Sequence, residues 1–383
     1  MRGSLLEAAR AKRDRLRGIA RRARGGGGGR PEVELEALPE PEPGGPVPHG
    51  AEDGGSRLVE FESFSLYLVR GWAASFAGDG GGGYTFLGEV EYSDVGVVMP
   101  QKEPDSRVGV YRDVAEARAA VEVVSAMKGG LMLWDGSLVV LSYSGHPARV
   151  GPRVEERLSE RLGLTLGEAL SEISRSWAEG VVPASPALVE SVLGAEGVDG
   201  GDYEWVALLE WSEKLLAVRV FLEEAWARGV LPVFVTKTSR STNFYGGPLP
   251  DVYYLREARP IDAFTTPPRL GRGIPEYAQG YVPRAWGLRE FYSTRLLRVE
   301  FYARLDPGAP ILAVEAAFPE GGPWGPRSAF ERALRGLLSL PRTRGYPLSL
   351  IVAHRRTHID SSLARRVIEA LGLSLERRER WML

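Results

Sequence analysis

Three acidic residues lie where a strand or a helix is expected to begin or end. Asp79 follows a strand predicted from Leu58 to Phe76, and glycines come directly after it. Asp135 ends the short apolar run LMLW, and Glu116 lies in the first turn of a helix predicted over 114–128. Ligands of α/β folds bind at the rim of the sheet, where strands end. The three carboxylates are therefore candidates to share one site.

Carboxylates gathered in this way suit the hydrolysis of a phosphodiester. Two divalent ions ~3.5–4 Å apart can stabilise both the attacking and the leaving oxygen. Bound metal also lowers the pKa of the attacking water. The chain has no cysteine and only 4 histidines, which excludes a thiolate site and disfavours a histidine-rich cage. We therefore expect hard cations such as manganese or magnesium.

Other polar side chains could complete such a site. His354 ends the run LSLIVAH, which predicts a strand over 348–354. Its imidazole could bind metal or carry a proton to the leaving group, and the adjacent Arg355 could hold a phosphate. In TKTSRST, Lys237 and Arg240 lie among hydroxyl side chains, which suits contacts to a nucleic-acid backbone.

Each of these residues also has an interpretation without chemistry. An Asp-Gly pair at a strand end is often only a turn. An acid in the first turn of a helix interacts favourably with the helix dipole, and Glu122 is as plausible by composition as Glu116. A lone histidine at a strand end can be structural, and TKTSRST can be a solvated loop. The sequence contains no GxxxxGK[ST], HExxH or GxSxG pattern, so these phosphate-binding, zinc-protease and hydrolase motifs are absent.

The organisation of the chain predicts one large α/β body behind an extended N-terminal region. Residues 1–24 are basic with helically spaced apolar residues, which predicts a helix. Residues 25–56 are rich in Gly, Pro and Glu, which predicts a flexible linker. From 57 to 383 strands alternate with helices, which predicts a mixed sheet flanked by helices. Residues 153–228 are expected to form a mostly helical insertion. Later elements are predicted as strands over 232–237, 295–304 and 310–317, and helices over 325–338 and from Asp360.

The overall charge is nearly balanced, with 48 basic and 50 acidic residues. This argues against a uniformly basic DNA-coating surface but leaves room for local basic patches. No stretch approaches the ~18 apolar residues of a membrane span. The basic N-terminus lacks the apolar segment of a secretory signal, so we expect a cytoplasmic protein with no membrane contact.

Three segments resemble elements of one family, the NurA nucleases. They occur in the family's order, and the likeness extends over about 58–375. LMLWDGSLVV is similar to the internal DGSL element, FVTKTSRS to the lysine–serine segment, and GYPLSLIVAH to the C-terminal element in which a tyrosine precedes a histidine by eight residues.

The resemblance implies a ribonuclease H-like fold, a manganese-dependent nuclease and a homodimer. It also implies a partnership with HerA, a hexameric DNA translocase and ATPase, in the resection of DNA ends. The family's acidic residues would correspond to Asp79, Glu116 and Asp135, and its tyrosine and histidine to Tyr346 and His354. One departure concerns the first acidic element, usually Asp-Gly-Ser, which is here matched to Asp79-Gly80-Gly81.

We therefore expect hydrolysis of DNA by two metal ions, Mn²⁺ or else Mg²⁺. Asp79 and Asp135 would be the main ligands, completed by Glu116, and His354 would bind metal or assist the leaving group. Tyr346 would position the substrate. The substrates would be single-stranded DNA and duplex ends, with 5′→3′ polarity and endonuclease activity on single strands. Two alternatives stay open: an inactive DNA-binding module that regulates a translocase, and an enzyme on the same core that acts on RNA or a small phosphoester.

Overall fold

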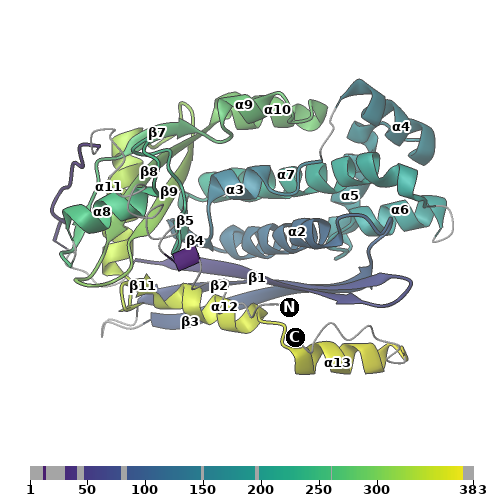
Figure 1. Cartoon of the computed structure of the whole chain (residues 1–383), viewed down its shortest axis with the longest axis horizontal. Coiled ribbons are helices and arrows are strands. Elements are labelled where there is room, and N and C mark those ends of the chain that lie inside the picture. Colours follow the sequence, from purple (N-terminus) through teal and green to yellow (C-terminus); the bar gives the residue numbers. More distant parts are fainter. Residues whose placement is uncertain are drawn as a thin grey trace.

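A large mixed sheet forms the centre of the protein. The computed structural model describes residues 12–13, 31–40, 47–78, 84–147, 151–194, 198–259 and 261–373. Within these residues the sheet has nine strands in the order β3-β2-β1-β4-β5-β9-β8-β6, and β7 pairs with β8 (Figure 1). Its strands are β1 (His49–Glu60), β2 (Ser65–Gly78), β3 (Tyr84–Val97), β4 (Gly130–Asp135), β5 (Val230–Thr236), β6 (Phe264–Thr265), β7 (Arg269–Arg272), β8 (Leu296–Arg304) and β9 (Leu312–Pro319).

The middle of this sheet is parallel and its two sides are antiparallel. β1 pairs with β2 and β2 with β3 as an antiparallel meander. β1, β4 and β5 then run parallel to one another, and β9 returns antiparallel beside β5. Because β1 and β4 run the same way, the residues that follow their paired segments lie together at one edge of the parallel region.

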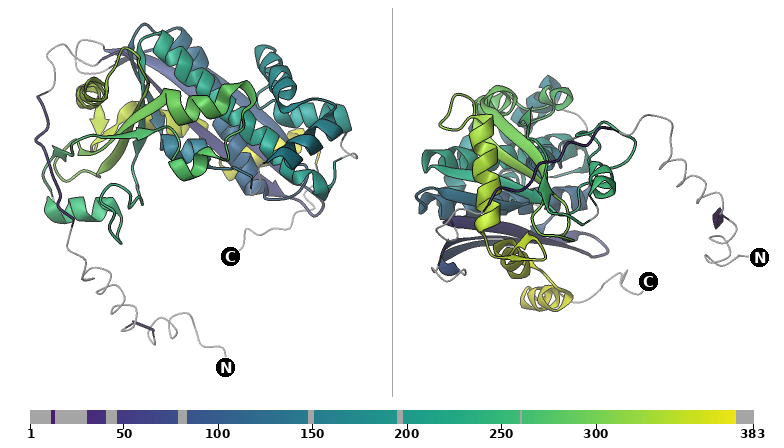
Figure 2. Two further views of the ribbon diagram at one scale, coloured as in Figure 1. Left: turned by 90° about the horizontal axis from the view of Figure 1, so that it is seen from above. Right: turned by 90° about the vertical axis from the view of Figure 1, so that its left-hand side faces the viewer.

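Helices cover both faces of the sheet. They comprise α2 (Pro104–Ser125), α3 (Leu138–Tyr143), α4 (Pro152–Leu162), α5 (Leu166–Ala178), α6 (Ser185–Leu193), α7 (Tyr203–Ala227), α8 (Asp251–Ala258), α9 (Glu276–Gln279), α10 (Leu288–Glu290), α11 (Pro326–Ser339), α12 (Leu348–Thr357) and α13 (Ser361–Ala370). α2 and α7 lie on one face, and α12 and α13 on the other (Figures 1 and 2). Each face has its own apolar core, one built on α2 and α4–α7 and the other on α11 and α12.

Small residues let α2 lie unusually close to the sheet. The helix is rich in buried alanines, including Ala115. Opposite it on β2 is Gly71, where a Cβ atom would lie 2.2 Å from the backbone carbon of Ala115. No side chain fits there, so the glycine sets the depth at which α2 packs on the sheet.

The predicted α/β class, with a mixed sheet flanked by helices, is confirmed. Several predicted elements agree with the structure within a few residues, namely β5, β8, β9, α11 and α13. The insertion over 153–228 is helical, with its break between α5 and α6. The basic helix predicted for residues 1–24 lies outside the described residues, apart from 12–13.

The predicted linker ends too late. Residues 49–56 form the first part of β1, and most of them are buried. Their glycines suggested a flexible segment, but Gly54 and Gly55 are needed because neighbouring helices approach the strand closely. Strand β1 therefore begins at His49, inside the predicted linker. Residues 31–40 also contact the body, since Glu36 exchanges two backbone hydrogen bonds with Thr265.

The predicted strand over 348–354 is a helix, and so is the apolar run LVVLS (138–142). The run over 348–354 lies in α12, where Leu350, Ala353 and Thr357 form the buried side at helical spacing. LVVLS lies in α3, and Ser137 caps its first turn by accepting from the Val140 N–H. A short apolar run fits a strand or a buried helix equally well, so periodicity alone gave the wrong element. The helix predicted over 114–128 begins earlier, at Pro104.

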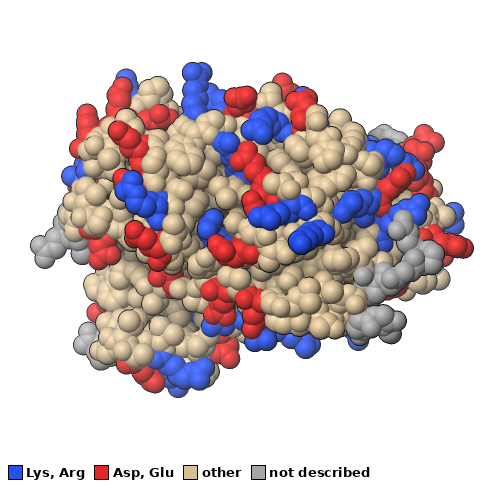
Figure 3. All heavy atoms as spheres, turned by 180° about the vertical axis from the view of Figure 1, so that it is seen from behind, with Lys and Arg blue, Asp and Glu red and all other residues tan. Residues whose placement is uncertain are grey.

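The surface carries charges of both signs. On the face shown in Figure 3, Lys and Arg side chains are interspersed with Asp and Glu and do not form one large basic patch. In the described part of the chain, no helix has the length and apolar character needed to cross a membrane.

Candidate metal centre

Two parallel strands and one helix bring three potential ligands together. In the parallel pairing of β1 with β4, Glu52 is opposite Trp134, so the next residues, Asp53 and Asp135, are neighbours. α12 places His354 beside them, with Nδ1 2.8 Å from Asp53 Oδ2. One ligand atom each from Asp53, Asp135 and His354 lies within 4.8 Å of the others. Two carboxylates and an imidazole are a donor set that suits a divalent ion such as Mn²⁺ or Mg²⁺.

Glu116 reaches the same place from α2. Its side chain is buried and lies on Gly54, where a Cβ atom would be 2.0 Å from Glu116 Oε1. On the opposite face of β1, a Cβ on Gly55 would lie 1.9 Å from the Thr357 carbonyl oxygen in α12. The two glycines thus let Glu116 and α12 close on the strand from both sides, next to Asp53.

These side chains border a small pocket with a volume of about 140 Å³. It is lined by Asp53, Gly54, Arg112, Asp113, Glu116, Trp134, Asp135, Gly136, Ser137, Val140, Leu141 and Ser144. A space of this size can hold metal ions with a few waters and one phosphate group, but not a whole nucleotide. A nucleic-acid substrate would have to lie across its mouth.

Two cationic side chains contact the carboxylates of this site. Lys237 Nζ lies 3.0 Å from Asp135 Oδ2 and also 4.0 Å from the centre of the Tyr346 ring. Arg112 Nε lies 3.1 Å from Glu116 Oε1. Both cations balance part of the negative charge of the clustered acids.

A buried network fixes Arg112 from behind. Its guanidinium is 2.7 Å from Asp113 Oδ1, and the other oxygen of Asp113 is 3.7 Å from Lys214 Nζ. Lys214 is fully buried and donates to the carbonyl and hydroxyl oxygens of Ser144. Burial lowers the pKa of Lys214 to about 8. The chain of contacts from α7 through Asp113 keeps Arg112 aimed at Glu116.

Burial and mutual repulsion raise the pKa values of the acids. Burial, with repulsion from Glu116 and Asp53, raises the pKa of the fully buried Glu52 well above its usual range. Glu52 also accepts a hydrogen bond from the Asp135 N–H at 3.2 Å. Burial raises the pKa of Glu116 too, although Arg112 opposes this, and the pKa of Asp53 rises through burial and the charge of Asp135. A divalent cation would relieve this repulsion and favour the ionised acids.

The tyrosine named by the sequence analysis lies beside this cluster. Tyr346 is buried at β11 (Tyr346–Pro347), which pairs with β10 (Arg342–Thr343). Burial and the nearby Asp135 carboxylate raise the pKa of its hydroxyl, so the phenol stays protonated. A protonated phenol can donate a hydrogen bond to a ligand.

Replacement of Glu52 by glutamine tests the electrostatics of the metal-free site. A carboxyl whose pKa is raised by folding binds more protons in the native than in the unfolded state, so it lowers stability as pH rises above about 4.5. Glu52→Gln removes this contribution and keeps an acceptor for the Asp135 N–H. In EDTA, the variant should therefore gain stability relative to wild type as pH rises from 5 toward 8.

Urea unfolding at several pH values measures this difference directly. Glu122→Gln is the matched control, because Glu122 is exposed and lies 3.5 Å from Arg118 on the outer side of the same helix. A stability difference for Glu52→Gln that stays constant with pH, or that shrinks as pH rises, would contradict the account.

Four of the predicted site residues are brought together and others are not. Glu116, Asp135, His354 and Lys237 meet at the pocket or its rim, with Tyr346 beside them. Asp79 lies outside the described residues and stays a prediction. Arg240 and Arg355 are exposed. They stay predictions as DNA contacts.

Sequence reasoning missed Asp53, which the structure places at the centre of the cluster. The available signal was the string Asp53-Gly54-Gly55-Ser56, an acid followed by small residues inside the supposed linker. Arg112 and Asp113 were also missed. In the sequence, two adjacent opposite charges on a helix look the same whether they are buried or exposed to solvent.

Comparison with known proteins identifies the family. The family model described as the NurA domain matches residues 50–359, most of the chain. The chain belongs to the NurA family. The matched range begins inside β1 and ends just beyond α12, so it includes Asp53 and His354. No curated protein matches the sequence.

Solved NurA structures share the fold of this NurA chain. The NurA nuclease from Sulfolobus solfataricus is 18% identical, with a TM-score of 0.64 over 97% of each chain. A NurA structure with manganese is 14% identical, with a TM-score of 0.62 over 96% of this chain and 99% of that one. A third, NurA bound to dAMP and manganese, has 14% identity and a TM-score of 0.54 over 96% of each chain.

Proposed function

We propose that this NurA protein is a metal-dependent deoxyribonuclease. The observation that supports it most strongly is the convergence of Asp53, Asp135 and His354, whose ligand atoms lie within 4.8 Å of one another. Glu116 adds a fourth donor from the opposite face of β1. We assign the first acidic position of the family to Asp53, in place of Asp79.

Each side chain has a separate role in the proposed reaction. Asp53, Asp135 and Glu116 would hold divalent ions, Mn²⁺ or else Mg²⁺, in a two-metal site. When bound, such ions supply a hydroxide nucleophile and neutralise charge on the phosphate. His354 lies 2.8 Å from Asp53 through Nδ1 and its side chain is 64% exposed, so it would bind a metal ion or give a proton to the leaving oxygen.

The two cations at the rim would then contact the substrate. Lys237 pairs with Asp135, and Arg112 pairs with Glu116. When metal binds, these two carboxylates would coordinate it instead of the cations. Their charges then become available for the oxygens of the scissile phosphate, for which a guanidinium is well suited. Arg240 and Arg355 would extend the backbone contacts, and Tyr346 would position the nucleotide.

The finer activities rest on membership of the family. We infer a 5′→3′ exonuclease on single- and double-stranded DNA with endonuclease activity on single strands. The protein would act as a homodimer in the cytoplasm, with a HerA-type hexameric ATPase, in the resection of DNA ends during break repair. The translocase would supply movement along DNA, for which this chain carries no P-loop motif.

A cleavage assay on end-labelled oligonucleotides tests the proposal. Single-stranded DNA, duplex DNA and RNA of one sequence would be incubated with Mn²⁺, Mg²⁺ or EDTA, with label at either end to give polarity. We expect cleavage of DNA with Mn²⁺ and none with EDTA. Binding without cleavage, even with a HerA-type partner present, would indicate an inactive DNA-binding module. Preferential cleavage of RNA would indicate a ribonuclease.

A further inference from the structure

We propose that a strip of aromatic residues leading from the metal pocket to a second, arginine-lined pocket is a binding site for single-stranded DNA. The inference rests on the proposed nuclease function, and it assigns the path that the unpaired strand follows away from the scissile phosphate. The strip consists of the rings of Tyr143, His146 and Tyr281, and the apolar side chain of Val140 joins it to the metal pocket.

The strip begins at the metal pocket itself. Ser137, two residues after Asp135, caps α3. On the outer side of this helix, Val140 lines the metal pocket and is 61% exposed. Tyr143 lies three residues later, on the same side of the helix. A six-residue helix is ~9 Å long, so α3 extends the site by more than one nucleotide.

Aromatic contacts continue the strip onto another part of the chain. The Tyr143 hydroxyl lies 2.9 Å from His146 Nε2, and their ring centres are 4.5 Å apart. His146 in turn stacks on Tyr281, with centres 5.4 Å apart and an angle of 21° between the rings. Tyr281 remains 42% exposed, so its ring is supported by His146 and still open to a ligand. An exposed ring held by a second ring is suited to stacking on a base.

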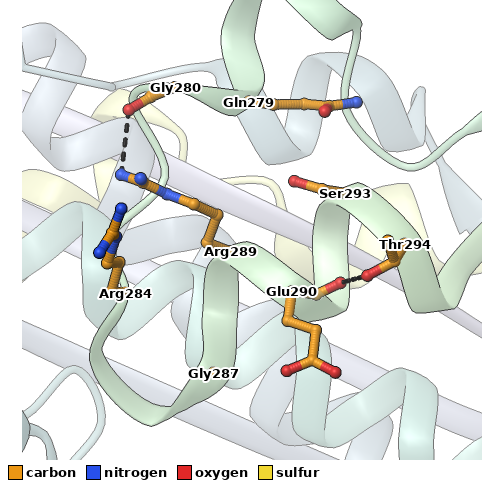
Figure 4. Close-up of a pocket in the computed structure, with 8 residues that line it drawn as sticks. All are labelled: Gln279, Gly280, Arg284, Gly287, Arg289, Glu290, Ser293 and Thr294. Atoms are coloured by element: carbon orange, nitrogen blue, oxygen red, sulfur yellow. Dashed lines mark hydrogen bonds between the residues drawn. The ribbon is translucent and has the colours of Figure 1, made fainter.

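The arginine-lined pocket includes Gly280, which directly precedes Tyr281 in the chain. Figure 4 shows the residues that line it. It has a volume of about 620 Å³, enough for a nucleotide. Its lining residues are Gln279, Gly280, Arg284, Gly287, Arg289, Glu290, Ser293 and Thr294.

Two arginines dominate the chemistry of this pocket. Arg289 donates to the carbonyl oxygens of Val282 at 2.8 Å and Gly280 at 3.1 Å, which fixes its guanidinium. Arg284 is exposed, lies beside Arg289 in Figure 4, and makes no ion pair with any residue that the structure describes. A fixed and a free guanidinium side by side form a phosphate-binding pair.

The combination of an exposed aromatic strip with only a pair of arginines in the adjoining pocket favours single-stranded over duplex DNA. Aromatic rings can stack only on bases that are not already stacked in a helix, and such stacking tolerates any sequence. Duplex binding depends on many backbone contacts along a broad basic surface. Here two arginines accompany the rings, and an acid, Glu290, lies in the same pocket.

Binding of DNA of different lengths to Tyr281→Ala tests the strip. Fluorescence anisotropy would be measured with single-stranded oligonucleotides of 2 to 12 nucleotides and with a blunt duplex, in EDTA to prevent cleavage. Loss of one base-stacking ring typically weakens binding by about tenfold. We expect this loss for the longer single strands, little change for dinucleotides and none for the duplex. Tyr281→Phe keeps the ring and should bind like wild type.

Arg284→Gln tests the adjoining pocket. It should weaken binding of the same longer strands and reduce the salt dependence of binding by about one phosphate contact. Arg327→Gln, on the exposed surface of α11, is the charge-matched control. Unchanged binding in both Tyr281→Ala and Arg284→Gln, or equal loss for duplex and single strands, would overturn the proposal. Cleavage by wild type with Mn²⁺ tells this failure apart from failure of the nuclease function.

Discussion

Asp53→Asn and Asp135→Asn should each reduce DNA cleavage by at least roughly a thousandfold, or about 4 kcal/mol of transition-state stabilisation. Asparagine has the shape of aspartate but cannot neutralise a cation. The two acids come from adjacent parallel strands, and one oxygen of each lies within 4.8 Å of the other and of His354, so each would contribute directly to holding metal.

Initial rates on labelled single-stranded DNA at saturating Mn²⁺ measure this effect. Asp53→Asn should unfold at or above the wild-type temperature in EDTA, because burial and the charge of Asp135 raise the pKa of Asp53 and so make its ionised form unfavourable in the folded protein. Glu122→Gln is the matched control and should cleave like wild type. Cleavage by Asp53→Asn within tenfold of wild type would rule out Asp53 as a metal ligand.

Gly71→Ala should destabilise the protein by about 3 kcal/mol or more, the upper range for overpacking of a core. The added Cβ would lie 2.2 Å from the Ala115 carbon and 2.4 Å from the Glu116 nitrogen, both backbone atoms of α2. A rotamer change cannot relieve a clash with backbone, so the helix itself must move. Because Glu116 is part of that helix, cleavage should fall as well.

Urea unfolding measured by circular dichroism gives this stability change. Gly88→Ala is the control: Gly88 lies on the neighbouring strand β3, and a Cβ there has no atom within 4 Å. Alanine also restricts the unfolded chain more than glycine does, so the control should be neutral or slightly stabilising. Equal stability of the two variants would show that α2 does not depend on Gly71 for its position.

Much of the fold after β4 could be predicted from sequence because strong local patterns specify it. The apolar runs that became β5, β8 and β9 are bounded by turn residues, and α11 has clear helical periodicity. Asp135 could be predicted as a site residue because it directly follows the apolar run LMLW, which forms β4. His354 was named as a site residue even though its element was taken for a strand.

The first acidic residue could not be placed in the same way. Asp53 lies in a segment whose glycines, proline neighbours and acids have the composition of a linker. Gly54 and Gly55 are there because Glu116 and α12 approach within the space of a methyl group. The need for glycine at these two positions comes from helices roughly 60 and 300 residues further along the chain, so no local sequence pattern predicts it.

Arg112 and its buried partners could not be predicted from sequence for a related reason. Arg112 and Asp113 are adjacent on α2, and only the buried Lys214 on α7 shows that they belong to one network. Lys214 lies inside an apolar helix, where sequence gives no sign of its partner. Long-range polar contacts of this kind follow from tertiary packing.

Titration of Mn²⁺ into wild type, Asp53→Asn and Asp79→Asn by isothermal calorimetry tests the central claim most directly. If Asp53, Asp135 and His354 form the metal centre, wild type and Asp79→Asn will bind Mn²⁺ alike, and Asp53→Asn will bind at least tenfold more weakly. If Asp79→Asn loses binding while Asp53→Asn retains it, the metal centre lies elsewhere and the account is contradicted.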